Sequence, residues 1–177
     1  MPARAHVYFL VAMSQDDLHR TLCNCLALRQ ASRHVTQFYD QVLAPSGIRT
    51  TQYSILHRVQ SQGPLTVNAL AEQLVMDPST LTHNLRPLLK DGLVVLEVGR
   101  TDRRQRAIAI TPEGQGVYRK ARPLWLRAQA DFERAVGDTQ AAALRDLLAA
   151  VARTGLGDGE AELNASPAPK RAARRGR

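Results

Sequence analysis

Residues 66–90 read TVNALAEQLVMDPSTLTHNLRPLLK and predict two helices joined by a tight turn. The helices are expected over Thr66–Leu74 and Pro78–Lys90, with three residues between them. Asp77 favours the start of the second helix, because an aspartate there accepts hydrogen bonds from free backbone amides and a proline suits the first turn. Ala71 is a small residue at the point where two helices joined by a short connection have to approach each other. The stretch therefore predicts a helix-turn-helix.

A β-hairpin is predicted directly after the second helix. Gly92 ends that helix, and the apolar runs Leu93–Val98 and Ala107–Ile110 have the composition of strands. Residues 99–106 between them form a basic loop with four arginines and one acid. Leu65 is expected to add a very short strand. Two helices followed by a cationic hairpin form the arrangement of a winged helix-turn-helix.

Long helices are expected on both sides of this unit. In chain order, the other helices run from Ser14 or Asp16 to about Leu43, over about Thr51–Gln62, from Pro112 to about Val136 with a kink or break at Pro123, and over Thr139–Ala152. A small domain cannot bury the apolar stripes of the helices at both ends, and a dimer interface is their expected use. The predicted fold class is mainly α with a small β-hairpin wing, a winged helix-turn-helix domain plus N- and C-terminal dimerisation helices.

Composition divides the chain into three segments. Residues 1–15 are expected to be a disordered extension, 16–153 one domain, and 154–177 a disordered basic tail rich in Gly, Ala, Pro and charge. Within the domain, 16–50 and 112–153 are the expected dimerisation helices and 51–111 the winged-helix lobe.

Charge and cysteine content narrow the class of protein. The net charge of +8 and the pI of about 10.3 favour a polyanionic partner, although part of the charge lies in the tail. Cys23 and Cys25 are the only cysteines, and at this spacing on a helix they point to different faces. We expect no disulfide framework and a reducing, cytoplasmic location. No apolar run reaches the length of a membrane span or makes a convincing signal peptide.

The second helix of the motif has one apolar and one polar side. Leu81, Leu85, Leu88 and Leu89 cluster on a helical wheel, and small polar and cationic residues lie opposite. Such a helix suits the major groove of double-stranded DNA, where Arg86 is placed to make a bidentate contact to guanine. The alternative is an ordinary amphipathic helix whose polar side faces solvent.

The wing is expected to contact phosphates and the minor groove, with a merely solubilising hairpin tip as the alternative. Asp102 is expected to bond a neighbouring arginine and shape the turn rather than touch DNA. The expected DNA contacts from the helix and the wing together are Ser79, Thr80, Thr82, His83, Arg86, Lys90, Arg100, Arg103, Arg104 and Arg106.

Several short motifs resemble the MarR family of bacterial transcriptional regulators. They are Leu70-Ala71, Ser79–Thr82, Asp91–Val94, and Asp102–Arg104 leading to Ile110–Gly114. The resemblance runs from about residue 18 to 152. It implies a homodimer that binds pseudo-palindromic operators, usually as a repressor, and that releases DNA when a small molecule or an oxidant acts on it.

The predicted first helix also resembles the organic-hydroperoxide sensors of that family. Cys25 falls on the position of their reactive cysteine, and Tyr39 matches one of its tyrosine partners. Arg29 and Thr50 stand where those sensors have further tyrosines, which counts against a sensor role for Cys25. The alternative is that Cys25 is a small core residue, and Cys23 is expected to be incidental.

The resemblance also implies an effector pocket between the dimerisation helices and the DNA-binding lobe. Such pockets often take aromatic carboxylates or their conjugates. The candidate residues are Arg29, Arg33, His34, Tyr39 and His57, each of which is otherwise an ordinary helix-surface or interface residue.

Two other classes of function have less support in the sequence. An enzyme is disfavoured, because the sequence has no Gly-rich phosphate loop, no nucleophile elbow and no Cys-x-x-Cys. The five histidines are scattered without ligand spacing, so neither a metal nor a cofactor is expected. A winged helix used only for protein contacts is the second alternative, and steep salt dependence of DNA binding would distinguish it.

Overall fold

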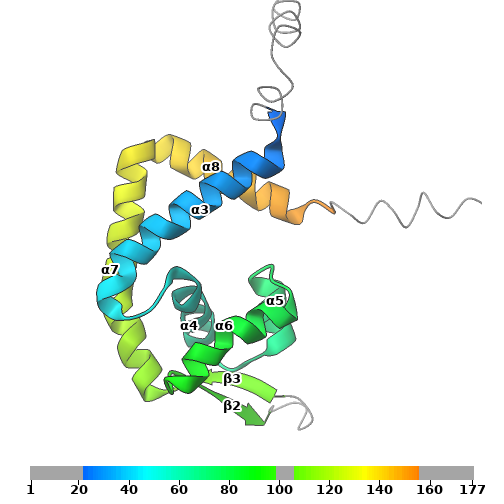
Figure 1. Cartoon of the computed structure of the whole chain (residues 1–177), viewed down its shortest axis with the longest axis vertical. Coiled ribbons are helices and arrows are strands. Elements are labelled where there is room, and N and C mark those ends of the chain that lie inside the picture. Colours follow the sequence, from blue (N-terminus) through cyan, green and yellow to red (C-terminus); the bar gives the residue numbers. More distant parts are fainter. Residues whose placement is uncertain (1–21, 99–105, 156–177) are drawn as a thin grey trace, which may run out of the picture. The chain divides into compact units, whose positions relative to one another are not determined.

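The computed structural model describes residues 22–98 and 106–155. The chain divides into two compact units, Met1–Arg134 and Ala135–Arg177. The described elements are α3 (Asn24–Leu43), a 3-10 turn (Ala44–Ser46), α4 (Thr50–Gln62), β1 (Leu65–Thr66), α5 (Val67–Gln73), α6 (Pro78–Lys90), β2 (Val94–Val98), β3 (Arg106–Ile110), α7 (Pro112–Val136) and α8 (Asp138–Arg153) (Figure 1). The predicted fold class, mainly helical with a small hairpin, is confirmed.

The helix-turn-helix is built on a continuous hydrophobic core. Helices α4, α5 and α6 gather beside the β2–β3 hairpin (Figure 1), and α6 contacts both α4 and α5. Tyr53 and Val59 of α4 are buried, and so is the predicted apolar side of α6, with Leu89 partly buried. The fully buried side chains of this core include Leu56, Leu70, Leu81, Leu88 and Ile108. Their burial holds α6 with one fixed side toward solvent.

The sheet has three antiparallel strands in the order β1-β3-β2. Leu65 pairs with Ile108, which confirms the short strand predicted there. Arg106 pairs with Val98 at the end of the hairpin, so it belongs to a strand and not to the loop in which the sequence placed it. The reason is that β3 has to extend by one residue to match all five residues of β2.

Helix α3 begins later than predicted. Cys23 has an extended backbone (φ −78°, ψ 95°), and its Sγ accepts a hydrogen bond of 3.4 Å from the amide of Leu26. The thiol therefore takes the role of a helix cap, and one unbroken helix from Ser14 or Asp16 to Leu43 is wrong. Residues 14–21 lie outside the described part of the chain.

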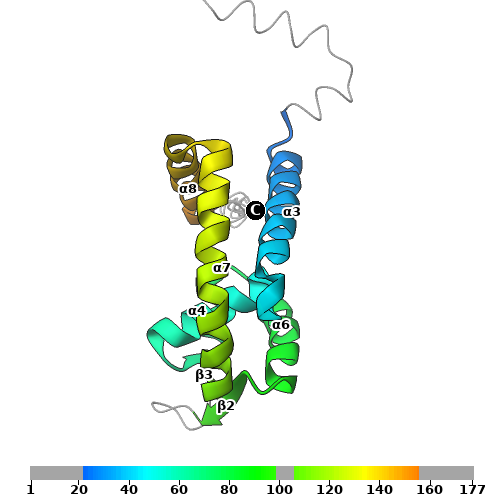
Figure 2. The same ribbon diagram turned by 90° about the vertical axis from the view of Figure 1, so that its left-hand side faces the viewer.

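Helix α7 begins as predicted and is not divided by its proline. Thr111 Oγ1 accepts a hydrogen bond of 3.0 Å from the amide of Gly114 and caps the helix. Pro123 lies inside an uninterrupted helix (Figure 2), which corrects the predicted break. A proline removes one backbone hydrogen bond. Ala121 and Trp125, on either side of it, pack into or against the core and hold the helix in place.

The second unit contains α8, which begins after Gly137 in the left-handed region (φ 95°). Its predicted apolar stripe is exposed and comprises Leu144, Leu147, Leu148 and Val151. Over residues 22–98 and 106–155, the helices are too short or too polar to cross a bilayer.

The turn between α5 and α6 is held by hydrogen bonds. Asp77 Oδ1 accepts from the amide of Ser79 at 2.8 Å and from its hydroxyl at 2.6 Å. These bonds to Ser79 stabilise the charged carboxylate and lower the pKa of Asp77 below its ordinary value of 3.8. The predicted cap of α6 is confirmed.

A second junction ties the end of α6 to the start of α7. Thr111 donates its hydroxyl hydrogen to the carbonyl oxygen of Gly92 at 2.7 Å, and its amide donates to the carbonyl of Leu93 at 3.1 Å. Gly114 is buried against the same carbonyl of Leu93, so a Cβ atom there would overlap it and lie 2.9 Å from Ile110 Cγ1. Only glycine fits this close approach of helix and strand.

We predict that Gly114→Ala destabilises the protein, because the atom it meets is backbone and cannot rotate away. The expected decrease in free energy of unfolding is about 1–3 kcal/mol, the usual cost of overpacking. Gly116→Ala is the matched control, since its Cβ would meet only a flexible Arg119 side chain at 3.9 Å. An alanine there should stabilise the helix by up to about 1 kcal/mol. Denaturant unfolding of both variants measures the difference, and equal stabilities would contradict the close approach.

We also predict that Asp77→Ala lowers the melting temperature, because the amide and hydroxyl of Ser79 lose their acceptor. Asp77→Asn keeps a capping oxygen without the charge and should lose less. Because folding lowers the pKa of Asp77, the charge contributes stability above pH 3.8, and that contribution is lost as the pH falls through the lowered value. The melting temperatures of wild type and Asp77→Asn should therefore converge in acid, and a constant gap would contradict the assignment.

Candidate nucleic-acid interface

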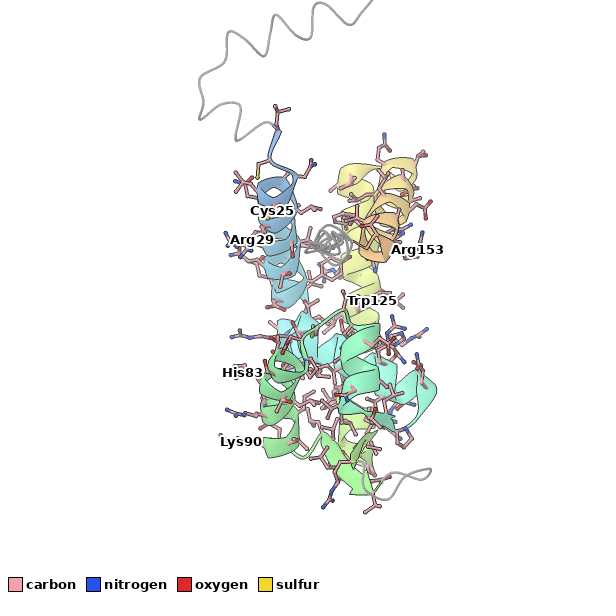
Figure 3. The ribbon with its side chains drawn as sticks, turned by 90° about the vertical axis from the view of Figure 1, so that its right-hand side faces the viewer. Cys25, Arg29, His83, Lys90, Trp125 and Arg153 are labelled. Carbon is pink, nitrogen blue, oxygen red and sulfur yellow. The ribbon has the colours of Figure 1, made fainter. Side chains whose placement is uncertain are left out.

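The polar side of α6 forms a continuous exposed surface. We call it the outward face of α6, and it comprises Ser79, Thr80, Thr82, His83, Arg86 and Lys90, all exposed. His83 and Lys90 project away from the lobe in Figure 3, while Leu81, Leu85 and Leu88 on the opposite side are buried. The structure thus brings together all six helix residues that the sequence proposed for DNA contact.

Two hydroxyls of this face are already used inside the helix. Ser79 donates its hydrogen to Asp77, and Thr82 Oγ1 donates to the carbonyl of Pro78 at 2.8 Å. Phosphate oxygens only accept hydrogen bonds, so these two hydroxyls suit base amino groups, which donate. Within the described part of the chain, the side chains of Thr80, His83 and Arg86 have no hydrogen-bond partner, and their donors are available to DNA.

The wing is described only at its base. Arg100, Asp102, Arg103 and Arg104 lie in residues 99–105, outside the described part of the chain. Arg106 is exposed on β3 beside the buried Ala107. The strand pair at the base of the wing is therefore anchored in the same core as α6.

The sensor candidates lie on α3 and are not close together within one chain. Cys25 is exposed near the start of α3, with Arg29 one turn later (Figure 3). Tyr39 is buried near the end of the helix, and its hydroxyl donates to Gln129 Oε1 at 2.7 Å. Fourteen residues of α-helix span about 21 Å, so Tyr39 cannot touch Cys25 of the same chain. A Tyr39 side chain at Cys25 would have to come from a partner copy.

The effector candidates are brought together only in part. Arg29 and Arg33 line one shallow hollow with Leu28 and Ser32. Arg33 also borders an open groove of about 790 Å³, which runs along α3 to Arg49. His34, Tyr39 and His57 line neither of these two hollows.

A stack of aromatic rings joins α4 to α7, and sequence reasoning missed it. The ring of Tyr53 stacks on His57, Tyr118 and Trp125 with centroid distances of 6.1, 5.5 and 5.7 Å. His57 Nδ1 and the Tyr118 hydroxyl are 2.9 Å apart, within hydrogen-bond distance. Burial, and then the neighbouring Tyr118, raise the pKa of Tyr53 above its usual range. The seven-residue spacing of Tyr118 and Trp125 on one helix side was the available signal.

Comparison with known proteins agrees with this architecture. Residues 46–105 match the model of the MarR family. The organic hydroperoxide resistance transcriptional regulator of Bacillus subtilis is 32% identical over 97 residues, which cover 55% of this chain and 66% of that protein. The HTH-type transcriptional regulator PetP of Rhodobacter capsulatus is 30% identical over 122 residues, which cover 68% of this chain and 73% of that protein.

Solved structures show the same fold. The transcriptional regulator MosR of M. tuberculosis in complex with DNA is 33% identical with a TM-score of 0.66, covering 81% of this chain and 99% of that one. CouR of Rhodococcus jostii bound to p-coumaroyl-CoA is 27% identical with a TM-score of 0.63, covering 72% and 90%. The family and the fold are as the sequence predicted, and the family is one of regulators and not of enzymes. The chain belongs to the MarR family and is a DNA-binding transcriptional regulator with a winged helix-turn-helix fold.

Proposed function

We propose that the protein is a homodimer that binds a pseudo-palindromic operator with one copy of α6 in each of two successive major grooves. The observation that carries this proposal is the outward face of α6, which is exposed and rich in hydrogen-bond donors, on a helix whose other side is buried in the core. Arg86 lies in the middle of that face and has the geometry to bind guanine O6 and N7. The wing arginines supply contacts to phosphate and the minor groove.

A second copy is the expected partner of the exposed apolar side chains outside the winged-helix lobe. Helix α8 exposes four aliphatic residues, and Leu28 of α3 is also exposed. Isolated exposed leucines are ordinary, but a stripe along a helix needs a cover. Two-fold symmetry would set the two reading helices about 34–36 Å apart, one turn of duplex DNA. We accordingly propose that the helices within residues 16–50 and 112–153 form the dimer interface.

We further propose that the protein is a repressor released by a small anionic effector, such as an aromatic acid or its conjugate. Arg29 and Arg33 line one hollow on α3, and a guanidinium binds carboxylate or phosphate with two parallel hydrogen bonds. The related CouR structure contains p-coumaroyl-CoA, an aromatic conjugate that carries phosphates. An effector releases DNA only if it binds the non-binding conformation more tightly.

A thiol-based response to organic peroxide is the second candidate, and the exposure of Cys25 favours it. The thiolate of Cys25 would attack the terminal oxygen of the hydroperoxide and break the O–O bond, leaving a sulfenic acid on the sulfur and an alkoxide that takes a proton from water and departs as the alcohol. Arg29, one helical turn away, brings a positive charge near the reacting sulfur. The similar Bacillus subtilis protein is named for organic hydroperoxide resistance.

We predict that Arg86→Ala relaxes sequence preference, because one bidentate base contact discriminates by about 1–3 kcal/mol. The double variant Arg103→Ala with Arg104→Ala should instead weaken binding to all sequences. It should also flatten the slope of log K against log salt by about 0.9 for each phosphate that the variant no longer neutralises. Competition binding with operator and random duplexes at several salt concentrations measures both effects. An unchanged slope in the double variant would remove the wing from the interface.

A separate pair of variants tests the sensor. Cys25→Ser should bind DNA normally and remain bound when an organic hydroperoxide is added, because serine cannot form a sulfenic acid. Cys23→Ser is the matched control, since a serine keeps an acceptor to cap the start of α3 and leaves Cys25 in place. DNA release is measured by fluorescence anisotropy with and without peroxide. Release from Cys25→Ser would place the peroxide sensor elsewhere, and a wild type that peroxide does not release would leave the small-molecule effector as the signal.

A further inference from the structure

Val75 has an unusual backbone at the entrance to α6. It is the only residue other than glycine with a positive φ (50°) among those the structure describes. A branched side chain in this left-handed region clashes with its own backbone, so such a conformation persists only where the surroundings impose it. Glycine or asparagine at this position would relieve the clash.

The neighbours of Val75 impose the conformation through backbone hydrogen bonds. The amide of Val75 donates to the carbonyl of Glu72 at 3.1 Å, and that of Met76 donates to the carbonyl of Ala71 at 2.9 Å. Two residues later Asp77 begins the cap of α6. The turn is thus fixed on both sides of Val75, and its side chain has one direction available.

That direction leads into solvent. Val75 is 76% exposed, the largest exposed fraction among the described large apolar residues, while its neighbour Met76 packs against the core. An isopropyl group in solvent adds little to the stability of the folded chain, and a glycine would adopt this backbone conformation at a lower cost in free energy. The conformation therefore carries a cost in the free protein, and an apolar contact made in the bound state would give the side chain a use.

We propose that Val75 is a specificity residue that contacts the C5-methyl group of a thymine beside the site read by α6. Val75 lies two residues before the cap of the helix whose outward face is assigned to the major groove, so this inference rests on the proposed function. The thymine methyl is the apolar group that the major groove displays, and apolar side chains read it by contact. A rigid, branched side chain loses little conformational entropy in that contact.

The test removes the apolar group from each partner in turn, first the thymine methyl and then the isopropyl group of Val75. The probe is a duplex that this protein selects from a random-sequence pool, in which each thymine is replaced by uracil one at a time. In the wild type, replacing one thymine per half-site should lower the affinity about three- to tenfold, corresponding to a good apolar contact. In Val75→Asn that uracil substitution should have no further effect, whereas Val75→Ile should respond like the wild type.

A stability measurement accompanies the binding series. Val75→Asn should raise the melting temperature, because asparagine tolerates positive φ, while Val75→Ile should not. A lower melting temperature for Val75→Asn would contradict the strain at this position. Identical uracil profiles in wild type and Val75→Asn would overturn the contact. If Arg86→Ala still relaxes sequence preference in that case, the reading role of α6 stands and only the assignment of Val75 fails.

Discussion

The close approach of Gly114 to the carbonyl of Leu93 fixes the geometry on which DNA recognition depends. Leu93 follows the end of α6 and precedes β2, and Gly114 lies in the first turn of α7. Thr111 bonds the carbonyl of Gly92 as well as the amide of Gly114. The reading helix, the base of the wing and the long helix are therefore held at one point. A helix and a hairpin can follow one duplex only if their relative positions are fixed in this way.

Hydrogen bonds hold the other end of α6 in a similar way. Asp77 binds the amide and the hydroxyl of Ser79, and Thr82 bonds back to the carbonyl of Pro78. These bonds keep the first turn rigid and remove two hydroxyl donors from the set that phosphate can use. In the proposed complex, the remaining donors of the outward face, on Thr80, His83, Arg86 and Lys90, would reach DNA without breaking an internal bond. Rigidity in the free protein lowers the entropy lost on binding.

Local signals explain what the sequence predicted well. Asp77 with Pro78 marked the start of α6, Gly92 marked its end, and the apolar runs fixed both strands of the hairpin. Thiol capping by Cys23 was missed because cysteine is not a usual cap and the apolar stripe continues through it. The positive φ of Val75 was missed because nothing in a valine signals it. The aromatic stack joins residues as far apart as Tyr53 and Trp125, which periodicity alone cannot pair.

Helix α4 is one link between the effector and sensor sites proposed on α3 and the helix proposed to read DNA. Asp40 near the end of α3 accepts a hydrogen bond of 2.7 Å from the amide of Thr50, the first residue of α4. Helix α4 then contacts α6 directly and is stacked on α7 through Tyr53. Since Leu56 and Ile55 are fully buried, α4 cannot shift without moving its neighbours. If the proposed stimulus, an anion at Arg29 and Arg33 or oxidation of Cys25, favours a different position of α3, a shift of the packed helix α4 would carry that change to the outward face of α6.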